Sequence, residues 1–268
     1  MGADIKQLRT RIKSVDSTLH LTKAMGLVAS SKIRKATESM NKGKEYAGAL
    51  TETVSLLTSF EECKKTPYMS IRGEKNTCLV VIAGDRGLAG GYNANIFRLV
   101  REYPDATVIP IGKRACERFG FPIVNAEGYS YENAIKLANE LCRDFLAGKY
   151  DRVGVVCTRY HSMMSQEAYV NWLLPLRAGE KSGASSAAIF EPDEITVLNS
   201  VIPDYIAGMI VSCVKESFAS EVAARRVAMD NAGKNAQEMI DRLDLEYNRA
   251  RQGAITQEIT EIVAGSGM

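Results

Sequence analysis

IKQLRTRIKSVDSTLHLTKAMGLVASSKIRKATESMNKGKEYAGALTETVSLL, residues 5–57, is the stretch that decides the fold. Apolar or small residues recur in it at alternating steps of three and four, and no proline precedes Pro67. A mean period of about 3.5 residues is typical of a coiled coil. We therefore predict one long helix, whose stripe is Ile5, Leu8, Ile12, Val15, Leu19, Thr22, Gly26, Ala29, Ile33, Ala36, Met40, Gly43, Ala47, Leu50, Val54 and Leu57.

A second stripe of the same kind lies near the C-terminus, where the spacing is again four and three: Ala236, Ile240, Leu243, Tyr247, Ala250 and Ala254. Pro203 suits a helix start and no proline follows it, so we expect a helix from about residue 204. Residues 1–60 carry ten Lys and Arg against five Asp and Glu, whereas residues 204–268 carry seven against ten. Opposite net charge favours pairing of the two helices. If Leu57 packs near residue 205, an antiparallel pair places Ile5 near residue 257, with about ten residues beyond it.

The middle of the chain changes period. Four apolar runs read as strands, at 77–85 (TCLVVIAGD), 106–112, 151–160 and 168–176, and helical patterns lie at 93–102, 113–118 and 131–146. Strands alternating with helices predict an α/β fold with an open, mostly parallel sheet. The expected organisation is an N-terminal coiled-coil helix over 1–62, an α/β foot domain over 75–200 and a C-terminal helix over 204–268 that pairs with the first in an antiparallel coiled coil.

Composition excludes several classes of protein. The net charge of +2 carries no signature of nucleic-acid binding, and the six cysteines contain no CxxC pair, which favours a reducing compartment. We expect no signal peptide, because the N-terminus is charged and amphipathic from residue 4 onward. The longest apolar runs fall short of the roughly 20 residues that a membrane helix needs. Any association with a membrane is therefore expected to be indirect.

One loop is spaced like a binding site. GDRGLAGGYN, residues 84–93, follows a strand and precedes a helix, but it matches neither G-x-G-x-x-G nor the G-K-[ST] of a phosphate-binding loop. The simpler interpretation is a tight turn, with Asp85 and Arg86 available for a partner. His20 and His161 have no triad around them, and nothing has metal-ligand spacing. We expect no catalytic, cofactor-binding or metal-binding residue in this chain.

The two long helices supply the candidate partner contacts. A basic stretch, comprising Lys23, Lys32, Arg34 and Lys35, flanks Met25 and Leu27, which lie off the apolar stripe. At the other end, Arg251 and Gln252 precede Ile255, Ile259, Ile262 and Val263. A protruding apolar helix tip has to be covered by another protein, because it would otherwise promote aggregation.

Three strings carry a resemblance to a known family. They are the pattern I-x-x-V-x-x-T-x-x-L-T-K-A-M-x-L-V-A-S-S-K-I-R-K over residues 12–35, D-R-G-L-x-G-G-Y-N over 85–93, and YNRARQGAITQEITEIVAG over 247–265. They resemble the gamma subunits of rotary F-type ATP synthases, and the similarity covers nearly the whole chain. The resemblance implies a non-catalytic rotating shaft that couples proton-driven rotation of a membrane ring to ATP synthesis and hydrolysis. The implied location is the cytoplasmic face of a bacterial plasma membrane, as a peripheral component.

The same resemblance implies the partners and their contacts. Alpha and beta subunits would surround the coiled coil, and the foot would rest on the c-ring with an epsilon subunit. Arg251 and Gln252 would meet a loop of the catalytic subunits, and Met25 with its basic neighbours would lie near an acidic lever. The complete set of expected partner-contact residues is Lys23, Met25, Lys32, Arg34, Lys35, Asp85, Arg86, Arg225, Arg251, Gln252, Ile255, Thr256, Ile259 and Ile262.

Two other classes of function stay open at this point. One is an α/β nucleotide-binding protein flanked by dimerising coiled coils, which would need a phosphate site at residues 84–91. The other is a coiled-coil scaffold that pairs with a second copy of itself.

Overall fold

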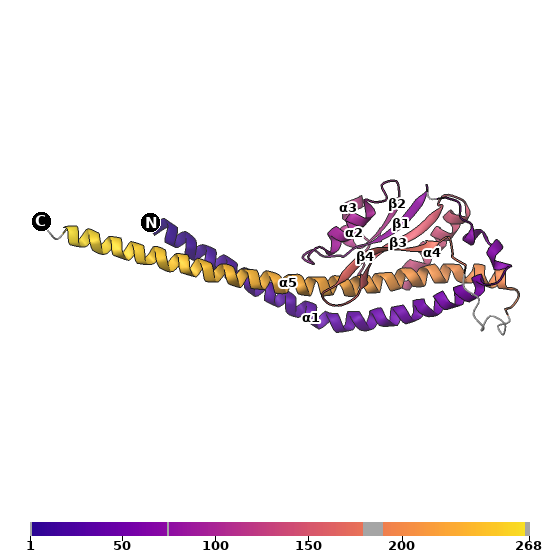
Figure 1. Cartoon of the computed structure of the whole chain (residues 1–268), viewed down its shortest axis with the longest axis horizontal. Helices are drawn as coiled ribbons and strands as arrows, with labels where there is room; N and C mark the ends of the chain where they lie inside the picture. The colour runs from indigo at the N-terminus through magenta and orange to yellow at the C-terminus, as the bar shows by residue number, and fades with distance from the viewer. Residues whose placement is uncertain (1, 74, 179–189, 266–268) are drawn as a thin grey trace. The chain divides into compact units, whose positions relative to one another are not determined.

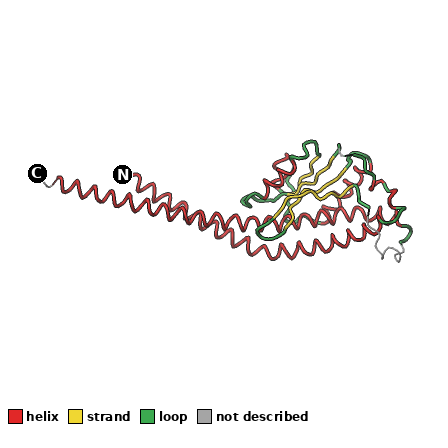
Figure 2. The backbone as a smooth tube through the Cα atoms, in the orientation of Figure 1, coloured by secondary structure: helices red, strands yellow, loops and turns green. Residues whose placement is uncertain are grey.

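The computed structural model describes residues 2–73, 75–178 and 190–265, with side chains from Ile5 onward. Two helices are far longer than the rest, α1 (Gly2–Thr58) and α5 (Glu194–Gly265). Between them, the described residues form four strands and three shorter α-helices, whose arrangement can be followed in Figures 1 and 2. In chain order these are β1 (Thr77–Ile82), α2 (Tyr92–Val100), β2 (Thr107–Ile111), α3 (Lys113–Phe119), α4 (Tyr131–Leu146), β3 (Arg152–Tyr160) and β4 (Gln166–Leu174), after two short 3-10 turns at Cys63–Lys65 and Pro67–Met69.

The chain divides into two compact units, and both long helices run through both of them. Unit 1 comprises Met1–Ser30 and Arg225–Met268, and unit 2 comprises Ser31–Ala224. This division differs from the predicted ranges 1–62, 75–200 and 204–268, which followed the expected helix ends. The physical reason is packing. Val54 and Leu57 of α1 are buried in the same core as the sheet, so these parts of the long helices belong with it. The α5 members of that core are Leu198, Ile202, Ile206, Ala207, Ile210, Cys213 and Val214.

The sheet of unit 2 has the strand order β2-β1-β3-β4. β1 pairs in parallel with β2 and β3, with Val80 beside Ile109 and Val155, while β4 returns antiparallel to β3. The prediction of an open, mostly parallel sheet is therefore confirmed. β1 is buried along its whole length, as expected for a central strand covered on both faces.

Alternate residues of β1 enter two different cores. Cys78, Val80 and Ile82 pack with α4, α5 and the end of α1, whereas Leu79 and Val81 pack with α2 and α3. Because successive side chains of a strand point to opposite faces, this alternation places helices on both sides of the sheet. Parts of the two long helices thus cover one face of the sheet of unit 2.

Helix α5 begins earlier than predicted. Asp193 caps it, because its carboxylate accepts the backbone N–H of Thr196 at 2.8 Å and the Thr196 hydroxyl at 2.8 Å. Pro203, predicted to start the helix, lies inside it. A proline removes one helical N–H donor, but burial of Leu198, Ile202 and Ile206 on both sides of Pro203 holds the helix together.

By length and composition alone, α5 is long and apolar enough to cross a membrane, since one stretch of 18 residues has a mean hydropathy of 1.6. Of that stretch, 56% is buried within the protein, which is the behaviour of a core helix.

The predicted stripe of α1 is confirmed residue by residue. From Ile5 to Leu57 each of its members is buried or half-buried. The stripe on α5 is likewise buried at Ala236 and Leu243 and half-buried at Ile240, Tyr247, Ala250 and Ala254. The heptad pattern therefore identified the packed face of both helices.

The register of the pair differs from the prediction. In unit 1, Gly26 lies against Met229 and Gly233 against Thr22, which places Ile5 opposite about residue 250. In unit 2, Leu50 lies against Gly208, so Leu57 is opposite about residue 201 and not 205. The difference near Ile5 is about one heptad. A shift of one heptad leaves the same face of each helix in the contact, so the stripes alone could not detect it.

Candidate functional site

In unit 1 the C-terminal end of α5 extends past the start of α1 (Figure 1). Residues 251–265 are exposed, apart from half-buried Ala254. Ile255, Ile259, Ile262 and Val263 have exposed fractions of 44%, 56%, 70% and 65%. The corrected register moves the point opposite Ile5 from about residue 257 to about residue 250, so about seven more residues of α5 lie beyond it. This is the predicted protruding tip, and it is longer than expected.

Polar residues lie at the base of the tip. Arg251 and Gln252 are exposed, and the Thr256 hydroxyl donates to the Gln252 carbonyl at 2.9 Å. Since the helix itself satisfies that hydroxyl, the long side chains of Arg251 and Gln252 offer the polar contacts here. Arg225, at the edge of unit 1, is half-buried.

A groove lies between α1 and α5 of unit 1. It has a volume of about 480 Å³, and its lining includes Gly26, Gly233, Lys23 and Leu27. Leu27 is 69% exposed, as its position off the stripe predicted, but Met25 is half-buried. Sequence reasoning missed two more apolar residues on this helix, Leu21 and Val28, which are 64% and 55% exposed. The sequence did contain a signal for them: Leu21 and Val28 are seven residues apart, which places both on the same side of the helix and outside the predicted stripe.

The basic stretch continues into unit 2 with a different role for each residue. Lys32 Nζ lies 2.8 Å from Glu127 Oε1, and Arg34 Nε lies 3.6 Å from Glu38 Oε1 on the same helix. Lys35 is exposed. The charge of Lys32 thus already fastens α1 to the loop before α4, which its position in a basic run could not reveal.

The loop at residues 84–91 is held by its own carboxylate. Asp85 accepts the backbone N–H groups of Lys113, Ala126 and Glu127 at 2.9, 2.9 and 2.7 Å. Arg86 lies 3.8 Å from the Glu127 carboxylate. The Asp85 side chain, expected to be available for a partner, is therefore engaged within the chain, because three N–H donors converge on it.

The same hydrogen bonds count against the alternative of a nucleotide-binding protein with a phosphate site at residues 84–91. A phosphate site in such a turn needs backbone N–H groups that point at the anion. Here Asp85 takes the N–H at the start of α3, and Asn93 Oδ1 takes the N–H of Gly84 at 3.0 Å. Leu88 adopts a φ of 61° and is 64% exposed, so the loop displays an apolar side chain to solvent.

Within the described residues, no three His, Cys, Asp or Glu side chains group so as to hold a metal ion. His20 lies 3.7 Å from Asp16 and His161 lies 3.1 Å from Glu167, both at exposed positions. Such pairs are typical of solvated surface contacts.

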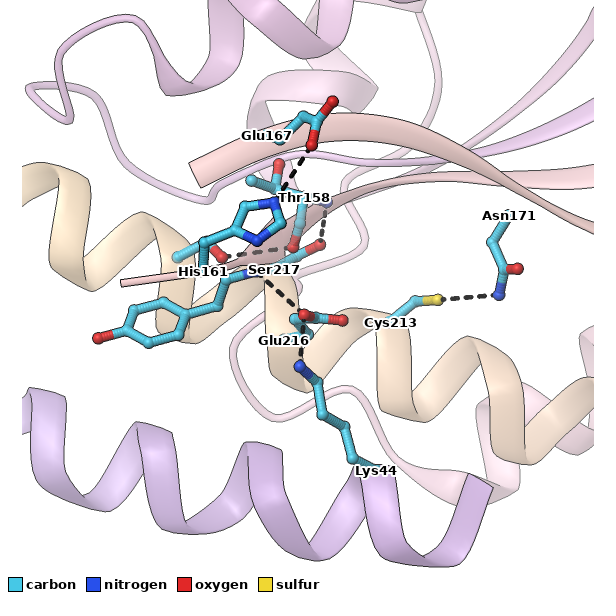
Figure 3. Close-up of polar contacts among 10 residues, drawn as sticks. Lys44, Thr158, His161, Glu167, Asn171, Cys213, Glu216 and Ser217 are labelled. Carbon is cyan, nitrogen blue, oxygen red and sulfur yellow. Dashed lines mark hydrogen bonds and ion pairs between the residues drawn. The ribbon is translucent and has the colours of Figure 1, made fainter. Parts of the chain in front are cut away.

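A polar cluster in unit 2 was missed by sequence reasoning (Figure 3). On α5, Glu216 binds Lys44 of α1 at 2.7 Å and accepts the N–H of Tyr160 at 3.0 Å. One residue on, the Ser217 hydroxyl accepts the N–H of Thr158 at 3.1 Å. The available signal was a run of polar residues in an otherwise apolar helix, Ser212, Glu216, Ser217, Ser220 and Glu221, all of them buried.

Comparison with known proteins gives consistent results. The family described as ATP synthase matches residues 4–267. An ATP synthase gamma chain from Ruminococcus albus is 40% identical, with 98% of each chain covered. A gamma chain from Acetobacterium woodii, named as sodium ion specific, is 35% identical, with 99% of each covered.

Solved structures have a similar fold. A chain of the Euglena gracilis mitochondrial ATP synthase, in an assembly of OSCP, F1 and c-ring, superposes with a TM-score of 0.71 at 20% identity, covering 99% of this chain and 94% of that one. A chain of the central stalk and c-ring of the Tetrahymena thermophila mitochondrial enzyme has a TM-score of 0.62 at 26% identity, covering 79% and 99%.

Proposed function

The chain belongs to the family of ATP synthase gamma chains, and from that premise we propose that it is the rotating central shaft of an F-type ATP synthase. In this role it couples ion-driven rotation of a membrane ring to conformational change in the surrounding catalytic subunits, and so to ATP synthesis and hydrolysis. The chain itself is non-catalytic. It sits at the cytoplasmic face of a bacterial plasma membrane, held there through the complex.

The exposed tip of α5 carries the proposal. Ile255, Ile259 and Ile262 form an apolar stripe at spacings of four and three on a helix end that α1 does not cover. An apolar helix of this kind needs a surrounding protein surface, and the alpha and beta subunits supply it. An asymmetric shaft in a sleeve of three similar neighbours meets each differently. Rotation then alters the nucleotide affinity of each in turn, which is coupling through differential contacts.

The other partners follow from the same role. The α/β unit is the foot, which binds the c-ring and an epsilon subunit. Proton coupling stays a prediction, because the Acetobacterium woodii relative is named as sodium ion specific. We assign the partner contacts to Lys23, Met25, Lys32, Arg34, Lys35, Arg86, Arg225 and the tip residues. Lys32 also pairs with Glu127 within unit 2, whereas the Asp85 carboxylate is engaged by backbone N–H groups.

Substitution of Arg251 tests the function. In the assembled complex reconstituted into vesicles, we expect Arg251→Ala to lower ATP-driven ion uptake and ATP synthesis about fivefold, the lower end of typical coupling factors. The folded chain should keep its helix content, because Arg251 is exposed.

Arg242→Ala is the matched control, since Arg242 is an exposed arginine on the same helix before the tip. It should leave both rates unchanged. Wild-type rates in the Arg251→Ala complex would remove the proposed contact.

A further inference from the structure

We propose that Lys44 and Glu216 form the joint through which unit 2 passes turning force between its sheet and its two long helices. This inference deepens the proposed function and rests on it. The residues are positioning residues, because they act on where the elements lie and not on a reacting group.

The joint connects three elements at one carboxylate oxygen. Glu216 Oε1 on α5 lies 2.7 Å from Lys44 Nζ on α1 and accepts the backbone N–H of Tyr160, at the end of β3, at 3.0 Å. The Glu216 side chain is only 7% exposed, whereas that of Lys44 is 43% exposed. In Figure 3 the Lys44 side chain rises from the lower helix to meet Glu216 directly beneath the strands.

Neighbouring hydrogen bonds also connect the same end of β3 to α5. The N–H of Thr158 donates to the Ser217 hydroxyl at 3.1 Å, and the Ser220 hydroxyl donates to the Thr158 carbonyl at 3.3 Å. From the other face, the Tyr92 hydroxyl donates to the Ser217 carbonyl at 3.0 Å. Hydrogen bonds are directional, so together they resist sliding of the strand along the helix.

Next to the joint, by contrast, α1 and α5 contact each other mainly through small and apolar residues. Gly43 faces Ser212, Gly208 faces Leu50, and Ala36 and Met40 pack on Ala219. Apolar burial is non-directional, so such a surface opposes separation of the helices much better than it opposes slippage. An ion pair between the buried Glu216 carboxylate and the partly exposed Lys44 ammonium supplies the missing resistance to slippage.

The heptad pattern makes that resistance specific. A slip of one heptad keeps the stripes in contact, but it would place Thr37 or Thr51 where Lys44 now meets Glu216. Glu216 would then be a buried carboxylate without its cation, which is strongly unfavourable. One polar pair in an apolar seam is a known way of selecting a register. We therefore infer that Lys44 and Glu216 select the register of α1 against α5 in unit 2.

Substitution of Lys44 is the direct test. Its side chain is half-exposed, so its positive charge can be removed without creating a cavity in the core. The quantity to measure is ion uptake per ATP hydrolysed by the complete complex in vesicles. We expect Lys44→Met to lower this ratio about fivefold while hydrolysis continues. Lys44→Arg, which keeps the cation, should restore most of it.

Lys234→Met is the matched control. Lys234 forms a 3.1 Å pair with Asp230, but both belong to α5 and are exposed, at 70% and 49%. Removing this charge should leave the ratio at the wild-type value. Hydrogen exchange gives a second readout: the Tyr160 amide should exchange faster in Lys44→Met than in either the wild type or Lys234→Met.

Three results would overturn the joint. They are a wild-type ratio in Lys44→Met, a loss of equal size in Lys234→Met, and failure of Lys44→Arg to recover the ratio. The joint and the shaft can fail separately. A normal ratio in Lys44→Met beside lowered rates of ion uptake and ATP synthesis in Arg251→Ala removes the joint and keeps the shaft. A normal ratio in Lys44→Met beside wild-type rates in Arg251→Ala removes the proposed shaft contact as well.

Discussion

At the scale of single residues, the carboxylate of Asp85 is the internal acceptor that fixes the loop after β1. It collects three backbone N–H groups from two segments that follow β2 in the chain. Hydrogen bonds from N–H groups to a charged acceptor are stronger than neutral ones, so the loop is fixed from within. A motif that looks like a ligand site in the sequence is thus a structural device in the fold.

Two glycines near this loop allow the cost of a positive φ to be distinguished from the cost of a steric clash. Gly112 and Gly120 flank α3 and have φ values of 98° and 75°. A Cβ on Gly112 would collide with the carbonyl oxygen of Ala83, while a Cβ on Gly120 would meet no atom within 4 Å. Ala83 cannot move aside, because its N–H donates to Ile111 at 2.9 Å and so belongs to the sheet.

We expect Gly120→Ala to lower the free energy of unfolding by about 1–2 kcal/mol, the cost of a left-handed conformation. Gly112→Ala adds the collision and should cost more than about 4 kcal/mol. Urea denaturation of the isolated chain measures both. Equal losses in the two variants would contradict the geometry at Gly112.

At the scale of elements, the two long helices use glycine in opposite ways. At Gly208 on α5 the side chains of α1 come close, since a Cβ there would meet the Leu50 side chain and would lie 3.0 Å from the Tyr46 ring. Gly48 on α1 is exposed and has no atom within 4 Å of an added Cβ. The first glycine allows packing, whereas the second only weakens the helix.

Alanine at each position should therefore change stability with opposite sign. Gly48→Ala should raise the free energy of unfolding by about 1 kcal/mol through helix propensity. Gly208→Ala should lower it by about 1–3 kcal/mol through overpacking. Thermal unfolding followed by circular dichroism is sufficient to see both. A stabilised Gly208→Ala variant would show that the helices can separate there without cost.

At the scale of the whole molecule, the two units are stabilised differently. Unit 1 buries a narrow line of residues between two helices, among them Leu19, Ala29, Ala236 and Leu243. Unit 2 has a layered core that buries all six cysteines. Because burial disfavours the thiolate, it raises the pKa of Cys78 to about 12 and that of Cys142 to about 11.

These thiols make the stability of unit 2 depend on pH in one direction. A pKa raised above the ordinary value of 9.0 means that the folded state holds the proton more tightly than the unfolded state. The stabilisation is fully present below pH 9 and is lost as the pH rises toward 12. For Cys78 alone we expect a loss of about 1.4 kcal/mol per pH unit in that window.

Urea denaturation at pH 8, 10 and 11 checks this expectation, with Cys78→Ala as the control that should show a shallower decline. Thiol reagents at pH 8 should label the cysteines slowly until the chain is unfolded. A stability that stays constant up to pH 11 would contradict it.

Much of the architecture was predictable from the sequence. The period of the apolar residues identified both long helices and their packed faces, and unbroken apolar runs identified the strands. The exposed tip was predictable because Ile255, Ile259 and Ile262 continue an apolar pattern past the end of any partner. These features depend on local periodicity, which is a property of the chain alone.

The tertiary structure decided the register of the two helices and the partners of individual polar residues, which periodicity cannot specify. A repeat of seven residues looks the same after a shift of seven, so the register of α1 against α5 was off by about one heptad near Ile5. Contacts between residues far apart in the chain resolve that ambiguity, through glycines that allow close approach at one place and through Lys44 meeting Glu216. The same reason explains the roles of Lys32 and Asp85. Their partners lie on other segments, and only folding brings those segments together.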